Sequence, residues 1–209
     1  TADGHLVDVR ARLLIDGGAY ASSSMAVIGN ASTFAAGPYE VPNALLEGTC
    51  VYTNNPPCGA MRGFGAVQAC FAHEGQMDRL ADALGLDPLE IRRRNAVRPG
   101  SVLPTGQVLG GSVPADEILD RLAAIPLPPE EPASARDPLR LPGGAGNVSR
   151  GEGLRRGVGY AFGFKNAGFS EGFDDSSEAR IRLSRGPGGP VAEVHSAAAE
   201  VGQGLHTVF

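Results

Sequence analysis

The stretch NNPPCGAMRGFGAVQACFAHEGQMDRLADALGLDPLEIRRRN, from Asn54 to Asn95, decides the fold of this chain. It begins with a proline pair, passes through a Gly-Phe-Gly turn and continues as a long amphipathic pattern. A simple helix start needs only a capping side chain and at most a proline. Two glycines around one aromatic residue indicate that the backbone passes close to a ligand, with the Phe64 ring at the ligand's edge. The alternative is a tight turn whose ring packs into the core.

Two helices are predicted within this stretch. Residues recur at helical spacing from Val67 to Leu84, and Gly85 stands where a left-handed residue commonly ends a helix. The stripe consists of Cys70, Glu74, Met77, Leu80, Ala81 and Leu84. The second helix starts with Asp87 as N-cap and Pro88 at the first helical position, and Glu90 completes a capping box. The basic triplet at residues 92–94 suits an ion-paired or solvated helix face better than a phosphate site.

The residues around this stretch predict further elements. Alternation with a period of two from Leu6 to Ile15 predicts a half-buried strand, and residues 45–53 predict a second strand. Residues 19–39 are small and have no clear period, so that they allow either a loosely patterned helix or a ligand-side loop. Residues 116–124 predict another helix.

The second half of the chain predicts a linker followed by strands. Residues 126–153 are rich in Pro, Gly, Ala and charge and have no sustained apolar period, which is typical of a linker. Three strand candidates follow, at 157–164, 178–184 and 191–197, and RGPGGP joins the last two as a hairpin. The fold class is therefore α+β, with two domain parts, residues 1–125 and 154–209, on either side of the linker.

Composition excludes several classes of partner. A formal net charge of -5 argues against nucleic acid and against an anionic membrane surface. No apolar run approaches the roughly 20 residues that cross a bilayer, and no export signal is visible, so we expect a cytoplasmic protein. Cys50, Cys58 and Cys70 are odd in number and lack CxxC spacing. They predict reduced, mostly buried thiols rather than a disulfide frame or a zinc or iron–sulfur site.

A second glycine-flanked residue stands near the end of the chain. Gln203, between Gly202 and Gly204, offers an amide donor and an amide acceptor to a polar ring system, although a simple turn explains the same pattern. Glu200 and His206 flank this turn. We expect both to be hydrogen-bonded and exposed rather than catalytic.

Several blocks resemble, in the expected order, the molybdopterin-binding large subunit of the xanthine dehydrogenase / aldehyde oxidase family. The blocks are GPYEVPN (37–43), residues 51–95, PTGQ (104–107), GYAFGFKNAGFSEG (159–172) and AAEVGQGLHTV (198–208). The resemblance implies a central fragment of a longer subunit, with parts of two molybdopterin-binding α+β domains. It also implies that the general-base glutamate lies beyond Phe209.

The resemblance also implies roles for single residues. Cofactor-binding positions are Arg62, Gly63, Gly202, Gln203 and Gly204, and the Arg62 backbone lies next to molybdenum. Substrate-binding positions are Phe64, whose ring packs on the substrate, Ser170 and Asn30. Asn30 stands where xanthine-oxidising members carry a substrate-orienting arginine, and this difference argues against xanthine as the substrate.

The resemblance implies oxidative hydroxylation of an aldehyde or an N-heterocycle with oxygen from water. The expected cofactor is molybdenum-molybdopterin, in the cytosine dinucleotide form in bacteria. Iron–sulfur clusters and FAD are expected on partner domains or subunits, so that the protein would be a hetero-oligomer acting on a small molecule. The alternative is a truncated, non-catalytic scaffold or partner-binding piece without the general base, and the 209-residue chain by itself is expected to be inactive.

Overall fold

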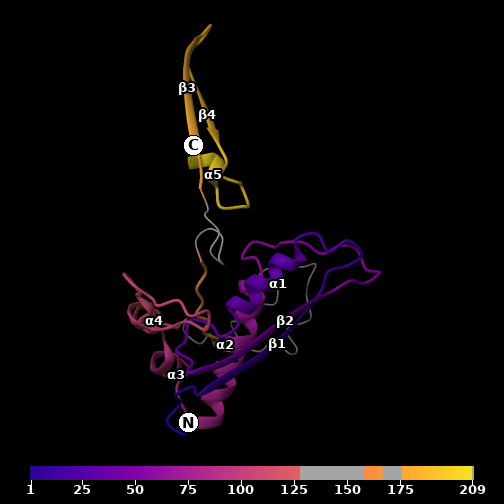
Figure 1. The fold of residues 1–209 in the computed structure, drawn as a ribbon. Coiled ribbons are helices and arrows are strands. Elements are labelled where there is room, and N and C mark those ends of the chain that lie inside the picture. The colour runs from indigo at the N-terminus through magenta and orange to yellow at the C-terminus, as the bar shows by residue number, and fades with distance from the viewer. Residues whose placement is uncertain (128–157, 167–175, 209) are drawn as a thin grey trace, which may run out of the picture.

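The structure is a computed structural model that describes residues 1–127, 158–166 and 176–208. Its elements are β1 Asp8–Asp16, α1 Ser24–Thr33, β2 Asn43–Val51, α2 Ala66–Leu84, α3 Pro88–Asn95, α4 Ala115–Ala123, β3 Ala179–Gly186, β4 Gly189–Ser196 and α5 Leu205–Val208. β1 and β2 run side by side along α2, and β3 and β4 form a separate hairpin (Figure 1). The mixture of helices and strands agrees with the predicted α+β class. Most of the predicted linker, residues 128–153, lies outside the described residues, and the two-domain division stays a prediction.

β1 and β2 form a parallel pair, in register from Asp8↔Asn43 to Asp16↔Val51. A parallel pair needs a crossover, and α1 supplies it. The ambiguous segment 19–39 therefore contains a helix. Gly48 of β2 lies under α1, where an added Cβ would come within 2.2 Å of the Ser32 hydroxyl. Both strand predictions are confirmed to within two residues at each end.

α2 and α3 form largely as predicted. Gly85 is left-handed (φ 65°) and ends α2, but Leu84 of the predicted stripe is 38% exposed, and Leu86 packs against the core instead. The Asp87 side chain accepts hydrogen bonds from the backbone N–H groups of Leu89 (2.8 Å) and Glu90 (3.0 Å). The capping box was predicted wrongly in one part, because the Glu90 carboxylate pairs with Arg94 at 2.8 Å instead.

Arg92 and Glu74 form an ion pair in the centre of the core. Arg92 is 0% exposed and Glu74 is 4% exposed, and Arg92 Nε lies 2.8 Å from Glu74 Oε2. Arg92 Nη2 also lies 2.8 Å from Asp78 Oδ1. The Tyr39 hydroxyl donates to Glu74, and His73 Nδ1 lies 3.1 Å from the same carboxylate. Buried charges are tolerated only when they are paired and hydrogen-bonded, and Arg92 and Glu74 meet that condition.

The basic triplet thus contains two kinds of arginine. Arg93 and Arg94 form partly exposed ion pairs with Asp120 and Glu90, as the sequence predicts. Arg92 is ion-paired too, but it is buried rather than solvated. It points into the core because Glu74 stands on the buried face of α2.

The strand predicted at 157–164 is wrong for its described part, because residues 158–166 have no regular secondary structure. The side chains of Glu74 and Arg92 form hydrogen bonds with the backbone of this segment, as a neighbouring strand would do in a sheet. The backbone N–H of Phe162 donates to Glu74 at 2.7 Å, and the carbonyl of Tyr160 accepts from Arg92 at 2.9 Å. By contrast, the hairpin prediction is confirmed: β3 and β4 pair antiparallel from Ala179↔Ser196 to Gly186↔Gly189.

The network sets the protonation of its own members. Burial by itself would raise the pKa of Glu74, but hydrogen bonds from His73, Tyr39 and Arg92 outweigh burial and leave this pKa below its ordinary value of 4.5. Burial, followed by the neighbouring Glu74 charge, raises the pKa of Tyr39. The network therefore contains an ionised carboxylate and a neutral phenol at neutral pH.

Replacing Arg92 by methionine should destabilise the protein by about 3–5 kcal/mol, because the change leaves the Glu74 charge buried and uncompensated. The free energy of unfolding in urea measures the effect. Arg93→Met, which removes a partly exposed pair, is the matched control and should cost less than about 1 kcal/mol. Equal, small losses for both variants would contradict the role given to the Glu74–Arg92 pair.

The same network predicts how stability depends on pH. Because the folded-state pKa of Glu74 is lowered, its contribution to stability is complete above the ordinary value of 4.5 and is lost as pH falls through the folded pKa. Glu74→Gln removes this titration. The variant should therefore be less stable than the parent at neutral pH, and the difference should shrink as acid is added. Urea unfolding at a series of pH values tests this, and a difference that stays constant with pH would refute it.

Candidate functional site

The Gly63-Phe64-Gly65 turn has an unusual backbone. The φ angles of its residues are 96°, 50° and 91°, all in the left-handed region. Phe64 has a Cβ, so this conformation is strained at that residue. The turn is closed by hydrogen bonds from Phe64 N to the Met61 carbonyl (2.7 Å) and from Ala66 N to the Gly63 carbonyl (3.0 Å). Strain of this kind persists only where the surroundings hold it, and it often marks ligand sites.

The turn is held against α1. An added Cβ at Gly65 would lie 2.4 Å from the Val27 carbonyl oxygen, so only glycine permits this approach. One turn further along α1, the buried Asn30 side chain donates to the carbonyl of Phe64. The structure therefore brings Asn30 and Phe64, both predicted substrate-binding residues, into direct contact. Contact of either residue with substrate stays a prediction.

Strained residues also occur in the loop that precedes α1. Ala21 (φ 57°) and Ser22 (φ 45°) join Phe64 as the non-glycine residues of positive φ in the described ranges. The first residue of α1 is tied to the residues before the turn, because the buried Ser24 hydroxyl donates to the Cys58 carbonyl at 2.9 Å. The strain thus gathers around the start of α1, next to the predicted site.

The cysteines differ in part from their prediction. All are free thiols, as expected, but Cys58 is exposed, and Cys50 and Cys70 are only partly buried. Cys58 is exposed because it lies in the irregular loop after the proline pair rather than in a strand or helix.

The Gly202–Gly204 turn is internally hydrogen-bonded. Glu200 accepts from the backbone N–H groups of Gly202 (2.6 Å), Gly204 (3.3 Å) and His206 (3.3 Å). The Gln203 side chain accepts from Val201 N and donates to the Ala199 carbonyl, each at 2.7 Å. Desolvation raises the pKa of Glu200, but the backbone hydrogen bonds outweigh it and lower the value. Glu200 is thus hydrogen-bonded as predicted but only partly exposed, whereas His206 is exposed as predicted and bonds to Glu200 through its backbone N–H.

The two predicted cofactor-binding segments meet through one hydrogen bond. Arg62 Nη1 donates to the Gly202 carbonyl at 3.0 Å, across 140 residues of sequence. The sequence predicts a role for the Arg62 backbone, but it has no signal for this contact of the side chain. Ser170 and Phe209 lie outside the described residues.

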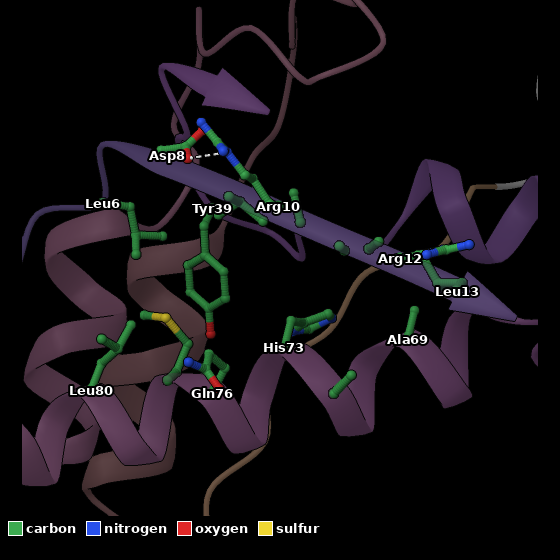
Figure 2. Close-up of a pocket in the computed structure, with 16 residues that line it drawn as sticks. Leu6, Asp8, Arg10, Arg12, Leu13, Tyr39, Ala69, His73, Gln76 and Leu80 are labelled. Carbon is green, nitrogen blue, oxygen red and sulfur yellow. Dashed lines mark hydrogen bonds and ion pairs between the residues drawn. The ribbon is translucent and has the colours of Figure 1, made fainter. Parts of the chain in front are cut away.

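A separate cavity of about 550 Å³ lies between β1 and α2 (Figure 2). Tyr39, His73 and Gln76 contribute polar groups, and consecutive residues from Asp8 to Leu13 line the other wall. Successive side chains point to opposite faces of a strand, so consecutive lining residues place an edge of β1 at this cavity, the edge that pairs with no strand in the described ranges. None of the predicted site residues lines it, and the sequence patterns do not reveal it.

Two further observations concern the described ranges as a whole. No three His, Cys, Asp or Glu side chains there are grouped so as to hold a metal ion. No helix in the same ranges combines the length and the apolar character needed to cross a membrane.

Comparison with known proteins identifies proteins whose sequences are similar to this chain. Residues 1–96 match the sequence profile of the molybdopterin cofactor-binding domain. The chain is 51% identical over 121 residues to the nicotinate dehydrogenase large molybdopterin subunit of Eubacterium barkeri, a match that covers 58% of this chain and 28% of that one. It is 36% identical over 211 residues to the xanthine dehydrogenase molybdenum-binding subunit of Escherichia coli O157:H7, covering 99% of this chain and 26% of that one.

A solved structure agrees with these relatives. The aldehyde oxidoreductase of Desulfovibrio gigas superposes with a TM-score of 0.54 at 38% identity, over 58% of this chain and 13% of that one. The chain thus spans 28% and 26% of the lengths of the two curated relatives named above.

Gly65→Ala should destabilise the protein by at least about 1–3 kcal/mol, because alanine is strained at φ 91° and its Cβ would collide with the Val27 carbonyl. Gly75→Ala, within α2, is the matched control. Its added Cβ would have no neighbour within 4 Å, so this change should stabilise α2 by roughly 0.5–1 kcal/mol. Urea unfolding measures both, and a neutral Gly65→Ala would contradict the packing of the turn on α1.

Proposed function

The chain belongs, through residues 1–96, to the molybdopterin cofactor-binding domains of the xanthine dehydrogenase / aldehyde oxidase family, and from this premise we propose that it is part of a molybdenum hydroxylase large subunit. The proposed reaction is the oxidative hydroxylation of an aldehyde or an N-heterocycle with oxygen from water. The 51% identical relative is named for nicotinate, which supports the N-heterocycle. Asn30, in place of an arginine, argues against xanthine.

The observation that carries this proposal is the hydrogen bond between Arg62 and Gly202. It joins two segments that are 140 residues apart and that resemble cofactor-binding segments of the family independently of each other. A chain that merely shared local motifs would have no reason to bring them together. Their contact supports one cofactor site made from both segments.

The residues present fit a molybdopterin cofactor. An added Cβ at Gly204 would meet no atom within 4 Å, and at Gly202 it would meet only Arg62 Nη1, at 3.5 Å, so a ligand has room to approach the turn. Gln203 offers a neutral amide donor and acceptor to a pterin ring, and the guanidinium of Arg62 suits the cofactor's phosphate. Arg62, Gly63, Gly202, Gln203 and Gly204 are the residues that would hold it, with the Arg62 backbone beside the metal.

The cofactor, in the cytosine dinucleotide form in a bacterium, supplies two-electron oxidation and the transfer of oxygen from water. The chain's own residues orient the substrate. The strained turn fixes the direction of the Phe64 ring, and an offset or edge contact with a flat substrate would contribute about 0.5–1.5 kcal/mol beyond its buried area. Asn30 holds the Phe64 carbonyl, and Ser170 is proposed to supply a hydroxyl to the same pocket.

The proposed enzyme needs partners that accept electrons. Iron–sulfur clusters and FAD on other domains or subunits are the proposed acceptors, and the protein would then act in the cytoplasm as part of a hetero-oligomer. A non-catalytic scaffold is the second candidate, and the experiment below distinguishes the two.

The protein, purified from its source with the chains that accompany it, should contain molybdenum and pterin in equal amounts. It should hydroxylate an N-heterocycle such as nicotinate, or an aldehyde, with ¹⁸O taken from labelled water. Elemental analysis, pterin fluorescence and product mass spectrometry make the measurement. Protein without molybdenum or turnover would refute the enzyme and leave the scaffold. Loaded protein whose product oxygen came from O₂ would refute the reaction type alone.

A further inference from the structure

We propose that Glu200 is a positioning residue, which holds the Gly202–Gly204 turn in the shape that receives the cofactor. The inference rests on the proposed function and adds a residue to the cofactor site that neither the sequence patterns nor the family resemblance assign to it. Glu200 itself is not proposed to touch the cofactor.

The first argument is the number of donors that converge on this carboxylate. The backbone N–H groups of Gly202, Gly204 and His206 all donate to it, at 2.6–3.3 Å. Backbone N–H groups of a turn that point to one place form an anion-binding concavity. Here the anion is a side chain of the same segment, so the inner side of the turn is filled from within the protein.

The second argument is that, within the described residues, hydrogen bonds rather than packed side chains hold the turn at Gly204, whose carbonyl accepts from Thr207 N–H at 3.0 Å. Gly202 (φ 93°) and Gly204 (φ 83°) are conformationally permissive residues, and an added Cβ at Gly204 would meet no atom within 4 Å. On the outer side, the Gly202 carbonyl accepts from Arg62. A carboxylate thus binds the N–H groups of the turn and a guanidinium binds its carbonyl. Removing the carboxylate would free the glycines to adopt other conformations.

The third argument concerns the division of roles within the turn. The Gln203 amide is bonded to Val201 and Ala199, which leaves one N–H and one oxygen lone pair of this amide for a pterin. The bonds to Glu200 involve the backbone N–H groups of Gly202, Gly204 and His206 instead. Gln203 is then the residue that meets the ligand, and Glu200 keeps the backbone of the turn fixed.

The experiment uses the protein purified with its partner chains and compares Glu200→Ala with the matched control Glu193→Ala. Glu193 is an exposed glutamate in β4, and its carboxylate lies 3.9 Å from Arg182 Nη1 and 3.8 Å from His195 Nε2. Removing an outer residue that orients a ligand typically weakens binding 10–100-fold. Pterin release after dilution, followed by its fluorescence, should therefore be about 10–100 times faster in Glu200→Ala, and unchanged in Glu193→Ala.

Two further measurements separate positioning from a general loss of structure. The thermal midpoint of the cofactor-free protein should be the same in Glu200→Ala and the parent, because the turn is exposed. Glu200→Gln keeps one acceptor oxygen and should retain the cofactor better than Glu200→Ala. It also provides the test if the alanine variant does not fold.

Parent protein that holds cofactor alongside a Glu200→Ala variant that releases it at the parent rate would overturn this inference and leave the proposed function intact. A Glu200→Ala variant whose cofactor-free protein has a lower thermal midpoint than the parent would also overturn the inference. Glu200 would then be merely structural. Parent protein that holds no cofactor would overturn the proposed function itself.

Discussion

The buried pair of Glu74 and Arg92 is the interaction on which the rest of the described structure depends. Two charges inside an apolar core are stable only if both stay paired and hydrogen-bonded. This requirement fixes α2 against α3, because each helix carries one of the charges. It also fixes residues 158–166, whose backbone N–H and carbonyl groups at Phe162 and Tyr160 bond to the same two side chains. A segment that follows the predicted linker is thus held to the helices that precede it.

The constraint reaches the candidate site through the length of α2. Glu74 stands in the middle of this helix, and the strained turn at residues 63–65 forms its start. A packed helix moves as a unit, so fixing its centre limits where the turn can lie. α1 completes the support, because Gly65 packs against its backbone and Asn30 bonds to Phe64. Arg62 therefore projects from a rigid base toward Gly202.

The site combines supports of two kinds. At the start of α2, the strained turn at residues 63–65 is held by packing on α1 and by the buried side-chain amide of Asn30. On the other side the Gly202–Gly204 turn is exposed and held by charge, with Glu200 at its N–H groups and Arg62 at its carbonyl. By resemblance, Asn30 occupies the position of the family's substrate-orienting arginine, but its observed contact is a different one. Its neutral amide bonds to the Phe64 carbonyl and supports the turn, and it brings no charge to a substrate.

Local patterns in the sequence were enough to predict β1, β2, α2, the Asp87 cap of α3, α4 and the β3–β4 hairpin, because periods of 3.6 and 2.0 and turn residues act over a few positions. The order of motifs was enough to identify the family. Only the tertiary structure decided that residues 24–33 form a helix, although their sequence has no visible helical period. It also decided that residues 158–164 form no strand and that Arg92 is buried. It also decided that Arg62 meets Gly202. Each of these features depends on a partner that is distant in the chain. The partner is Gly48 for α1, Glu74 for Arg92 and Phe162, and Gly202 for Arg62. A local sequence period contains no information about contacts between residues so far apart.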